Sequence, residues 1–187
     1  DSRSSSPSLS KAMIKGLMDS GITVYDIGYS LSQIVYFAAY YFRTKGGVMI
    51  TASHNPKEYN GFKFSMGFSE TMFYEEIQEL RVIVQSEKFT SLQTKGKYIQ
   101  KDIFPDYKQD LFRHIGPIKK FKVVIDACAS TPGLFMPAIL RQDGCDVVEQ
   151  NTTPDGSFPV GTPDPTEREV QERLARRVIE EKADLGF

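Results

Sequence analysis

The chain has 187 residues, 40% of them hydrophobic and 25% charged, which are the proportions of an ordinary soluble protein with a sizeable core. Its 23 basic and 24 acidic residues give a net charge of −1, so no overall field favours nucleic acid or an anionic membrane as a partner. No apolar run reaches the length of a membrane-spanning helix and no signal peptide is visible, so we expect a cytoplasmic protein.

The two cysteines, Cys128 and Cys145, follow no metal-type spacing and lie in or beside segments that are expected to be buried. Free thiols in a reducing cytosol are the simplest interpretation. A disulfide and a reactive thiol are the alternatives.

Helical and extended segments alternate through the first half of the chain, a pattern typical of α/β proteins. In chain order we expect a helix capped by Ser6, with Pro7 in its first position, that ends at Gly21; a strand over 22–27; a helix over 31–42; a strand over 47–51; a short strand over 62–64; and a helix that begins near residue 72 and carries Ile77, Leu80 and Val84 on its apolar face. Residues 86–105 are polar and are expected to be irregular.

A second series of elements follows in the rest of the chain. In order, we expect a connecting helix over 107–115 that ends at Gly116-Pro117, a strand over 121–126, a helix over 133–141, a strand over 146–149, a loop over 151–165, a helix introduced by a capping box at Thr166 and Glu169, and a strand over 183–187. The first two of these strands and the helix between them form a βαβ unit with an expected right-handed crossover. Asp126, at the end of a strand, is interpreted as a cap for the following turn rather than as a metal ligand.

The most informative segment is the hexapeptide TASHNP over residues 51–56, between a strand-like run and a turn signal at Asn60-Gly61. Ser53 then lies on a loop at the end of a buried strand, where open α/β sheets place their ligand sites. A serine hydroxyl in such a place needs partners that handle either a proton or a transferable anionic group. Lys63, which a hairpin would fold back toward the loop, is the nearest cationic candidate. A turn serine and a solvated strand lysine are the structural alternatives.

Residues 51–63 resemble the phosphoserine loop of the α-D-phosphohexomutases, in particular of their phosphomannomutase/phosphoglucomutase branch. Other segments resemble that family in the same order along the chain: residues 1–3 and 7–9 the end of its first motif, 123–126 the opening strand of its second domain, 155–159 and 163–165 the long loop of that domain, and 182–187 the strand that leads into its magnesium loop. The resemblance covers essentially the whole chain, and the serine loop is its most specific part.

The resemblance implies two consecutive α/β domains, each a mixed, mainly parallel sheet sandwiched by helices. We expect phosphohexomutase domain I over residues 1–104, a connecting helix and linker over 105–118, and domain II over 119–187. Domain II is expected to be incomplete, because the family's acidic Asp-Gly-Asp metal loop has no counterpart in the sequence. The family's domains III and IV have no counterpart either. The chain is therefore interpreted as a fragment that has the missing domains as partners and is inactive alone.

The resemblance also implies an activity, the interconversion of hexose 1-phosphate and hexose 6-phosphate by an isomerase that uses a phosphoserine and a bisphosphorylated sugar intermediate. Ser53 matches the phosphoserine, Lys63 the general acid/base, and His54 and Asn55 the residues that orient the loop and contact the phosphoryl group. The expected ligands are glucose or mannose 1- or 6-phosphate and the bisphosphate. Mg²⁺ is the expected cofactor, bound through the phosphate of Ser53, with its other ligands absent from this chain.

Two further residues match positions near the serine. Arg3 matches an arginine that helps to hold the anion, and Asn60 a position that binds phosphate or substrate. Structural alternatives stay open: His54 as a loop-packing residue, and Arg3 as a frayed residue at the chain end. For the whole protein, the alternative function is a non-catalytic phosphosugar-binding or interaction module that has kept the serine loop.

Overall fold

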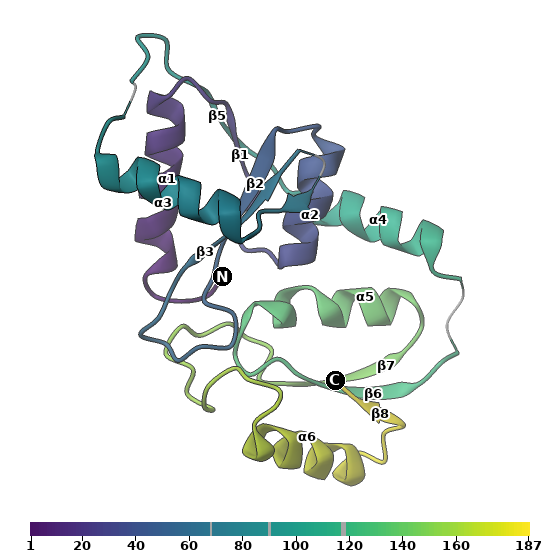
Figure 1. Ribbon diagram of the computed structural model, residues 1–187. Coiled ribbons are helices and arrows are strands. Elements are labelled where there is room, and N and C mark those ends of the chain that lie inside the picture. Colours follow the sequence, from purple (N-terminus) through teal and green to yellow (C-terminus); the bar gives the residue numbers. More distant parts are fainter. Residues whose placement is uncertain (68, 90, 117–118) are drawn as a thin grey trace. The chain divides into compact units, whose positions relative to one another are not determined.

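The computed structural model describes residues 1–67, 69–89, 91–116 and 119–187, and it has the predicted α/β architecture, in which helices accompany parallel and antiparallel sheets (Figure 1). The chain forms two compact units: unit A comprises residues 5–50 and 62–103, and unit B comprises residues 1–4, 51–61 and 104–187. The predicted division into family domains stays a prediction. In the part of the chain that the structure describes, every helix is too short or too polar to cross a bilayer.

Unit A alternates helices and strands. Its elements are α1 (Ser6–Asp19), β1 (Val24–Asp26), α2 (Ser32–Tyr41), β2 (Gly46–Ile50), β3 (Phe62–Met66), β4 (Glu70–Thr71), α3 (Tyr74–Ser86) and β5 (Tyr98–Gln100). β1 and β5 pair in parallel, whereas β2, β3 and β4 form an antiparallel sheet in that order. Ile50 of β2 is aligned with Phe62 of β3, so residues 51–61 leave and re-enter the sheet at adjacent strand ends.

The core of unit A lies between α2 and β2. The buried residues of α2 are Ile34, Val35, Ala38 and Ala39. They share one face because residues four apart lie on the same side of a helix. Gly47 of β2 faces this helix, and a Cβ there would lie 3.1 Å from Cγ1 of Val35. A glycine therefore lets α2 approach the strand closely and helps to fix the strand from which the serine loop departs.

Two predictions for unit A are wrong. The cap of α1 is Ser5, and Ser6 is already the first helical residue. Residues 86–105 are not irregular throughout, since β5 pairs in parallel with β1. A three-residue strand whose partner is distant in the sequence has too little local periodicity to be predicted.

Unit B is built on a parallel sheet with the strand order β7-β6-β8. Its elements are α4 (Phe104–His114), β6 (Lys122–Asp126), the 3₁₀ helix η1 (Thr131–Leu134), α5 (Met136–Gln142), β7 (Asp146–Gln150), α6 (Arg168–Glu180) and β8 (Leu185–Gly186). β6 is the central strand, and Val123, Val124 and Ile125 are at most 3% exposed. This continuous apolar run is typical of a parallel strand that is buried on both faces.

Two predictions about where helices begin in unit B are wrong. The predicted helix over 133–141 is a 3₁₀ turn followed by α5, because Pro137 has no N–H to continue the preceding turn. The predicted capping box is also wrong, since α6 begins at Arg168 without a side-chain cap. Thr166 instead donates its hydroxyl and its N–H to Oδ1 of Asp164, at 2.7 and 2.9 Å. This local turn takes the threonine away from the helix.

Single-residue predictions for unit B have mixed outcomes. Cys128 and Cys145 are both free and buried, as predicted. α4 begins at Phe104, before the expected residue 107, and its second residue is a proline, whose missing N–H costs nothing in a first turn. The helix is predicted to end at Gly116-Pro117, but Pro117 lies outside the described residues.

α6 ends in a Schellman motif that can be strengthened. Lys182 has a left-handed φ of 51°; its N–H donates to the Ile179 carbonyl at 3.1 Å, and the Ala183 N–H donates to the Val178 carbonyl at 2.9 Å. Glycine adopts this conformation without the penalty that a Cβ incurs, so we expect Lys182→Gly to raise the free energy of unfolding by roughly 0.5–1 kcal/mol in urea denaturation. Lys182→Ala keeps the Cβ and is the control. An equal gain in both variants would contradict this explanation.

Candidate functional site

Residues 51–61 form a loop that is closed by its own hydrogen bonds. The Thr51 N–H donates to the Gly61 carbonyl at 2.9 Å across the base of the loop. The Thr51 hydroxyl accepts the Ser53 N–H at 3.0 Å. Ser53 is exposed and has a left-handed φ of 57°, a conformation that is uncommon for serine. Its surroundings therefore have to hold it there.

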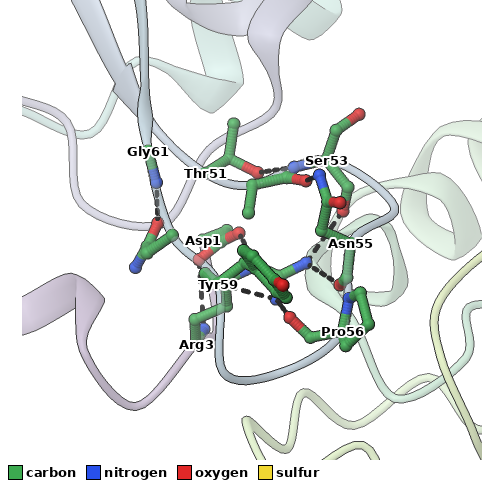
Figure 2. A network of polar contacts seen from close by, with 10 residues as sticks. Asp1, Arg3, Thr51, Ser53, Asn55, Pro56, Tyr59 and Gly61 are labelled. Atoms are coloured by element: carbon green, nitrogen blue, oxygen red, sulfur yellow. Dashed lines mark hydrogen bonds and ion pairs between the residues drawn. The ribbon is translucent and has the colours of Figure 1, made fainter.

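The guanidinium of Arg3 lies inside this loop and is 1% exposed (Figure 2). Its Nη1 and Nη2 atoms donate to four carbonyl oxygens of the loop: those of Ser53 (3.0 Å), Asn55 (2.7 Å), Pro56 (2.7 Å) and Tyr59 (3.1 Å). Its Nε donates to the carboxylate of Asp1 at 3.1 Å, so all five N–H groups are engaged. Burial lowers the pKa of Arg3, but a guanidinium titrates so high that it stays charged.

Residues of the 151–165 loop support Arg3. The guanidinium carbon lies 5.1 Å from the ring centroid of Phe158, which is 8% exposed. At Gly156 a Cβ would lie 2.4 Å from the Ser2 carbonyl oxygen, so the backbone of residues 2–4 can approach this loop only at a glycine. The 151–165 loop thus holds Arg3 in place, and Arg3 in turn holds the 51–61 loop, which carries Ser53.

Most of the predicted site residues lie together on the serine loop. Ser53, His54 and Asn55 are consecutive and exposed. The Asn55 side chain donates to the Ala52 carbonyl at 2.8 Å, and Oδ1 of Asn60 accepts the neighbouring Gly61 N–H at 2.8 Å, so both asparagines shape the loop. Figure 2 shows the Ser53 side chain directed away from Arg3, toward which the Ser53 carbonyl is turned. The hydroxyl is therefore open to a ligand from solvent.

Two predicted site residues differ from this group. The guanidinium of Arg3 lies inside the loop, and its N–H groups are all engaged by the protein, so its contact with an anion stays a prediction. Lys63 is exposed on β3 in unit A, aligned with Met49 of β2. Its partnership with Ser53 also stays a prediction.

A second polar cluster joins β6, β7 and α6 within unit B. The Asp126 side chain is 1% exposed, and its Oδ2 accepts a hydrogen bond from Nε of Arg173 at 2.6 Å. Its other donors are the N–H of Cys128 (2.9 Å), Nε2 of Gln150 (2.9 Å) and Nδ2 of Asn151 (3.0 Å). Burial raises the pKa of Asp126, but these hydrogen bonds outweigh burial and lower the pKa below its usual value. Asp126 caps the turn after β6, as predicted, and also forms an ion pair with Arg173 in which the carboxylate is buried and the arginine side chain is 23% exposed.

The described residues do not by themselves make a magnesium site. Mg²⁺ requires near-octahedral oxygen coordination. In the ranges that the structure describes, no group of three His, Cys, Asp or Glu side chains is placed so that it could hold a metal ion. A phosphorylated Ser53 would contribute one ligand oxygen, and the others would have to come from elsewhere.

Comparison with known proteins identifies the family. Residues 1–91 match the family model described as phosphoglucomutase/phosphomannomutase, alpha/beta/alpha domain I. Residues 106–187 match the corresponding model for alpha/beta/alpha domain II. The chain belongs to the phosphoglucomutase/phosphomannomutase family.

Relatives in the phosphoglucomutase/phosphomannomutase family align along the whole chain. A phosphomannomutase/phosphoglucomutase of Pseudomonas aeruginosa is 38% identical over 187 residues, and a phosphoglucomutase of Neisseria gonorrhoeae is 36% identical over 187; each alignment covers 100% of this chain and 40% of the relative. A crystal structure of a phosphoglucomutase/phosphomannomutase family protein from Burkholderia thailandensis has a TM-score of 0.91 at 29% identity, covering 100% of this chain and 42% of that chain. The chain thus spans about 40% of the length of the curated relatives it matches.

Two residues that support the site, Gly156 and Phe158, are missed when the sequence alone is considered. The segment 155–159 is recognised as part of a long family loop, but nothing local in it indicates a contact with residues 2–4. The available signal is an aromatic residue in an otherwise polar loop rich in proline and glycine, which marks a loop that packs against something.

Proposed function

We propose that Ser53 carries the phosphoryl group in a phosphohexomutase that interconverts hexose 1-phosphate and hexose 6-phosphate. The observation that supports this most directly is an exposed serine hydroxyl on a loop whose backbone is held from behind by Arg3. Such a loop keeps the reacting atom in one place and leaves it open to a sugar. Family membership supports the same reaction for the whole protein. The relatives are longer than this chain, which covers 40% of the Pseudomonas aeruginosa protein.

The proposed reaction consists of two phosphoryl transfers. In the first, the bond from phosphorus to the Ser53 oxygen breaks while a sugar hydroxyl oxygen bonds to phosphorus, and the hydroxyl proton passes to a base. The products are a bisphosphorylated sugar and a free serine. In the second transfer, the Ser53 oxygen bonds to the other phosphate, and the released sugar oxygen takes a proton back. This route avoids a direct transfer between C1 and C6, whose oxygens are far apart.

The other predicted residues have defined roles in this proposal. Lys63 accepts and returns the proton, while His54, Asn55 and Asn60 contact the phosphoryl group or the sugar. Phosphoserine carries a charge of about −1.5 to −2 at neutral pH, so it needs nearby donors and a cation. Mg²⁺ would neutralise part of this charge, with the phosphate on Ser53 as its ligand from this chain. Glucose and mannose phosphates are the proposed substrates, and the cytoplasm is the proposed location.

A ³¹P NMR assay of the full-length protein tests the proposed function. Glucose 1-phosphate or mannose 1-phosphate is supplied with a small amount of the matching hexose bisphosphate. We expect the resonance of the 1-phosphate to be replaced by that of the 6-phosphate. Binding of the hexose phosphate without any 6-phosphate would instead support a non-catalytic phosphosugar-binding module.

Replacing Lys63 tests its role as the acid and base. We expect Lys63→Met to lower kcat by roughly 10²- to 10⁴-fold, the usual contribution of a positioned proton-transfer group. The variant should still bind hexose phosphate, as measured by isothermal titration calorimetry. Lys45→Met, at another exposed lysine of unit A, is the matched control and should keep its rate. Equal kcat values for Lys63→Met and the wild type would remove Lys63 from the mechanism.

A further inference from the structure

We propose that Arg3, supported by Phe158, is a positioning residue for phosphoryl transfer at Ser53: it turns the carbonyl groups of the serine loop inward, so that N–H groups beside Ser53 face outward as donors for the phosphoryl group. This inference rests on the proposed function of Ser53. It assigns Arg3 an indirect role, through the loop backbone, in place of a contact with substrate.

The direction of the N–H groups follows from the carbonyls that Arg3 binds. In a trans peptide the C=O of one residue and the N–H of the next point in opposite directions, and the described backbone contains no cis peptide bond. The carbonyls of Ser53 and Pro56 point at Arg3, so the N–H groups of His54 and Lys57 point away from it. Neither N–H has an acceptor among the described residues. Backbone N–H groups that point outward from a turn attract anions.

Only an arginine matches the inside of this loop. Four carbonyl oxygens and one carboxylate oxygen surround the guanidinium, and each receives one of its five N–H groups. A lysine at position 3 would keep the charge but has three donors and no planar fork. A lysine would therefore leave some carbonyl oxygens of the serine loop without a donor, and the loop would change conformation to expose them to water. Ser53 would then lose the surroundings that hold its left-handed φ.

The support behind Arg3 is itself specific. Phe158 is buried against the guanidinium, and the approach at Gly156 leaves no room for a side chain. Removing the ring should therefore loosen Arg3 without removing any hydrogen-bond donor from the loop. Phe158→Leu is expected to raise amide exchange in the serine loop and to lower kcat, as an Arg3 substitution does, but by a smaller factor.

Hydrogen–deuterium exchange of the full-length protein tests the positioning role without relying on catalysis. In Arg3→Ala we expect amide exchange in peptides covering residues 51–61 to rise about tenfold or more, while the strand over Lys122–Asp126 exchanges as in the wild type. The exposed Arg168→Ala on α6 is the matched control and should change neither. Unchanged exchange in the loop would overturn the proposal, as would an equal rise in β6, which would show general loosening of unit B.

Steady-state kinetics provide the second readout. For Arg3→Ala we expect kcat to fall roughly 100-fold with KM nearly unchanged, because misplacing the reacting group slows chemistry more than binding. Millimolar guanidinium, but not sodium at equal ionic strength, should restore part of the kcat that Arg3→Ala loses. If Arg3→Ala fails to fold, Arg3→Lys takes its place, and its kcat should also lie below that of the wild type. A raised KM with unchanged kcat would show direct substrate binding and overturn the proposal. An inactive wild type would refute the proposed function, while the exchange result would still decide whether Arg3 positions the loop.

Discussion

Replacement of Ser53 by alanine is expected to lower the turnover of the full-length protein by roughly three to six orders of magnitude, because it removes the hydroxyl that we propose carries the phosphoryl group. The side chain is exposed and directed away from Arg3, so its loss should change the free energy of unfolding by less than about 0.5 kcal/mol. A coupled mutase assay and urea denaturation of the same preparation measure the two effects.

Ser53→Gly is the companion variant that separates chemistry from folding. Ser53 has a φ of 57°, which glycine adopts more readily than alanine, so Ser53→Gly should be more stable than Ser53→Ala by roughly 0.5–1 kcal/mol. Both variants should nevertheless be equally inactive. Turnover within tenfold of the wild type in either variant would mean that the hydroxyl does not carry the phosphoryl group.

Asp126→Asn is expected to have the largest effect on stability, a loss of about 3–5 kcal/mol, because it leaves Arg173 without its anionic partner in a largely buried site. The Asp126 side chain is 1% exposed and lies 2.6 Å from Nε of Arg173. Such a loss is a large part of the total stability of a typical domain. Urea denaturation followed by circular dichroism measures it.

Two controls show whether the buried ion pair is the cause. Glu172→Gln breaks the exposed pair with Arg168, whose side chains are 56% and 90% exposed, and should cost less than about 1 kcal/mol. The double variant Asp126→Asn with Arg173→Met removes the orphaned charge and should recover part of the loss. If the double variant is as unstable as the sum of the single changes, the ion pair is not the source of the effect.

The same carboxylate predicts how stability depends on pH. Burial raises the pKa of Asp126, but the bonds from Arg173, Asn151, Cys128 and Gln150 lower it further than burial raises it. Because the folded pKa lies below the unfolded value of about 3.9, this contribution is complete above that value and disappears as the pH falls through the folded pKa. Wild-type stability should therefore fall more steeply than that of Asp126→Asn on acidification below about pH 4.

Local signals allowed the serine loop to be placed from sequence. A strand-like run, the TASHNP hexapeptide and the Asn60-Gly61 turn predict a hairpin, and the structure pairs Ile50 with Phe62 across it. The Asp126 turn is equally local, since its Oδ1 accepts the N–H of Cys128 only two residues away. Predictions of this kind depend on a few neighbouring residues and need no knowledge of the fold.

The features that sequence reading misses depend on residues far apart in the chain. Arg3 reaches carbonyls that are 50 and 53 residues away, and Arg173 reaches Asp126 over a separation of 47 residues. Each contact is made by a single side chain, so neither produces a repeating pattern of residues that could be recognised in the sequence. The capping box at Thr166 fails for a different reason, since Asp164 accepts the Thr166 N–H that Glu169 would have to accept in a capping box.

Intact-mass analysis of the full-length protein, before and after incubation with a hexose bisphosphate, tests the role of Ser53 most directly. We expect the mass to rise by one phosphoryl group, peptide mapping to locate that group on Ser53, and addition of hexose monophosphate to remove it at a rate matching turnover. Turnover of hexose phosphate by a protein that never carries phosphate on Ser53 would contradict the account.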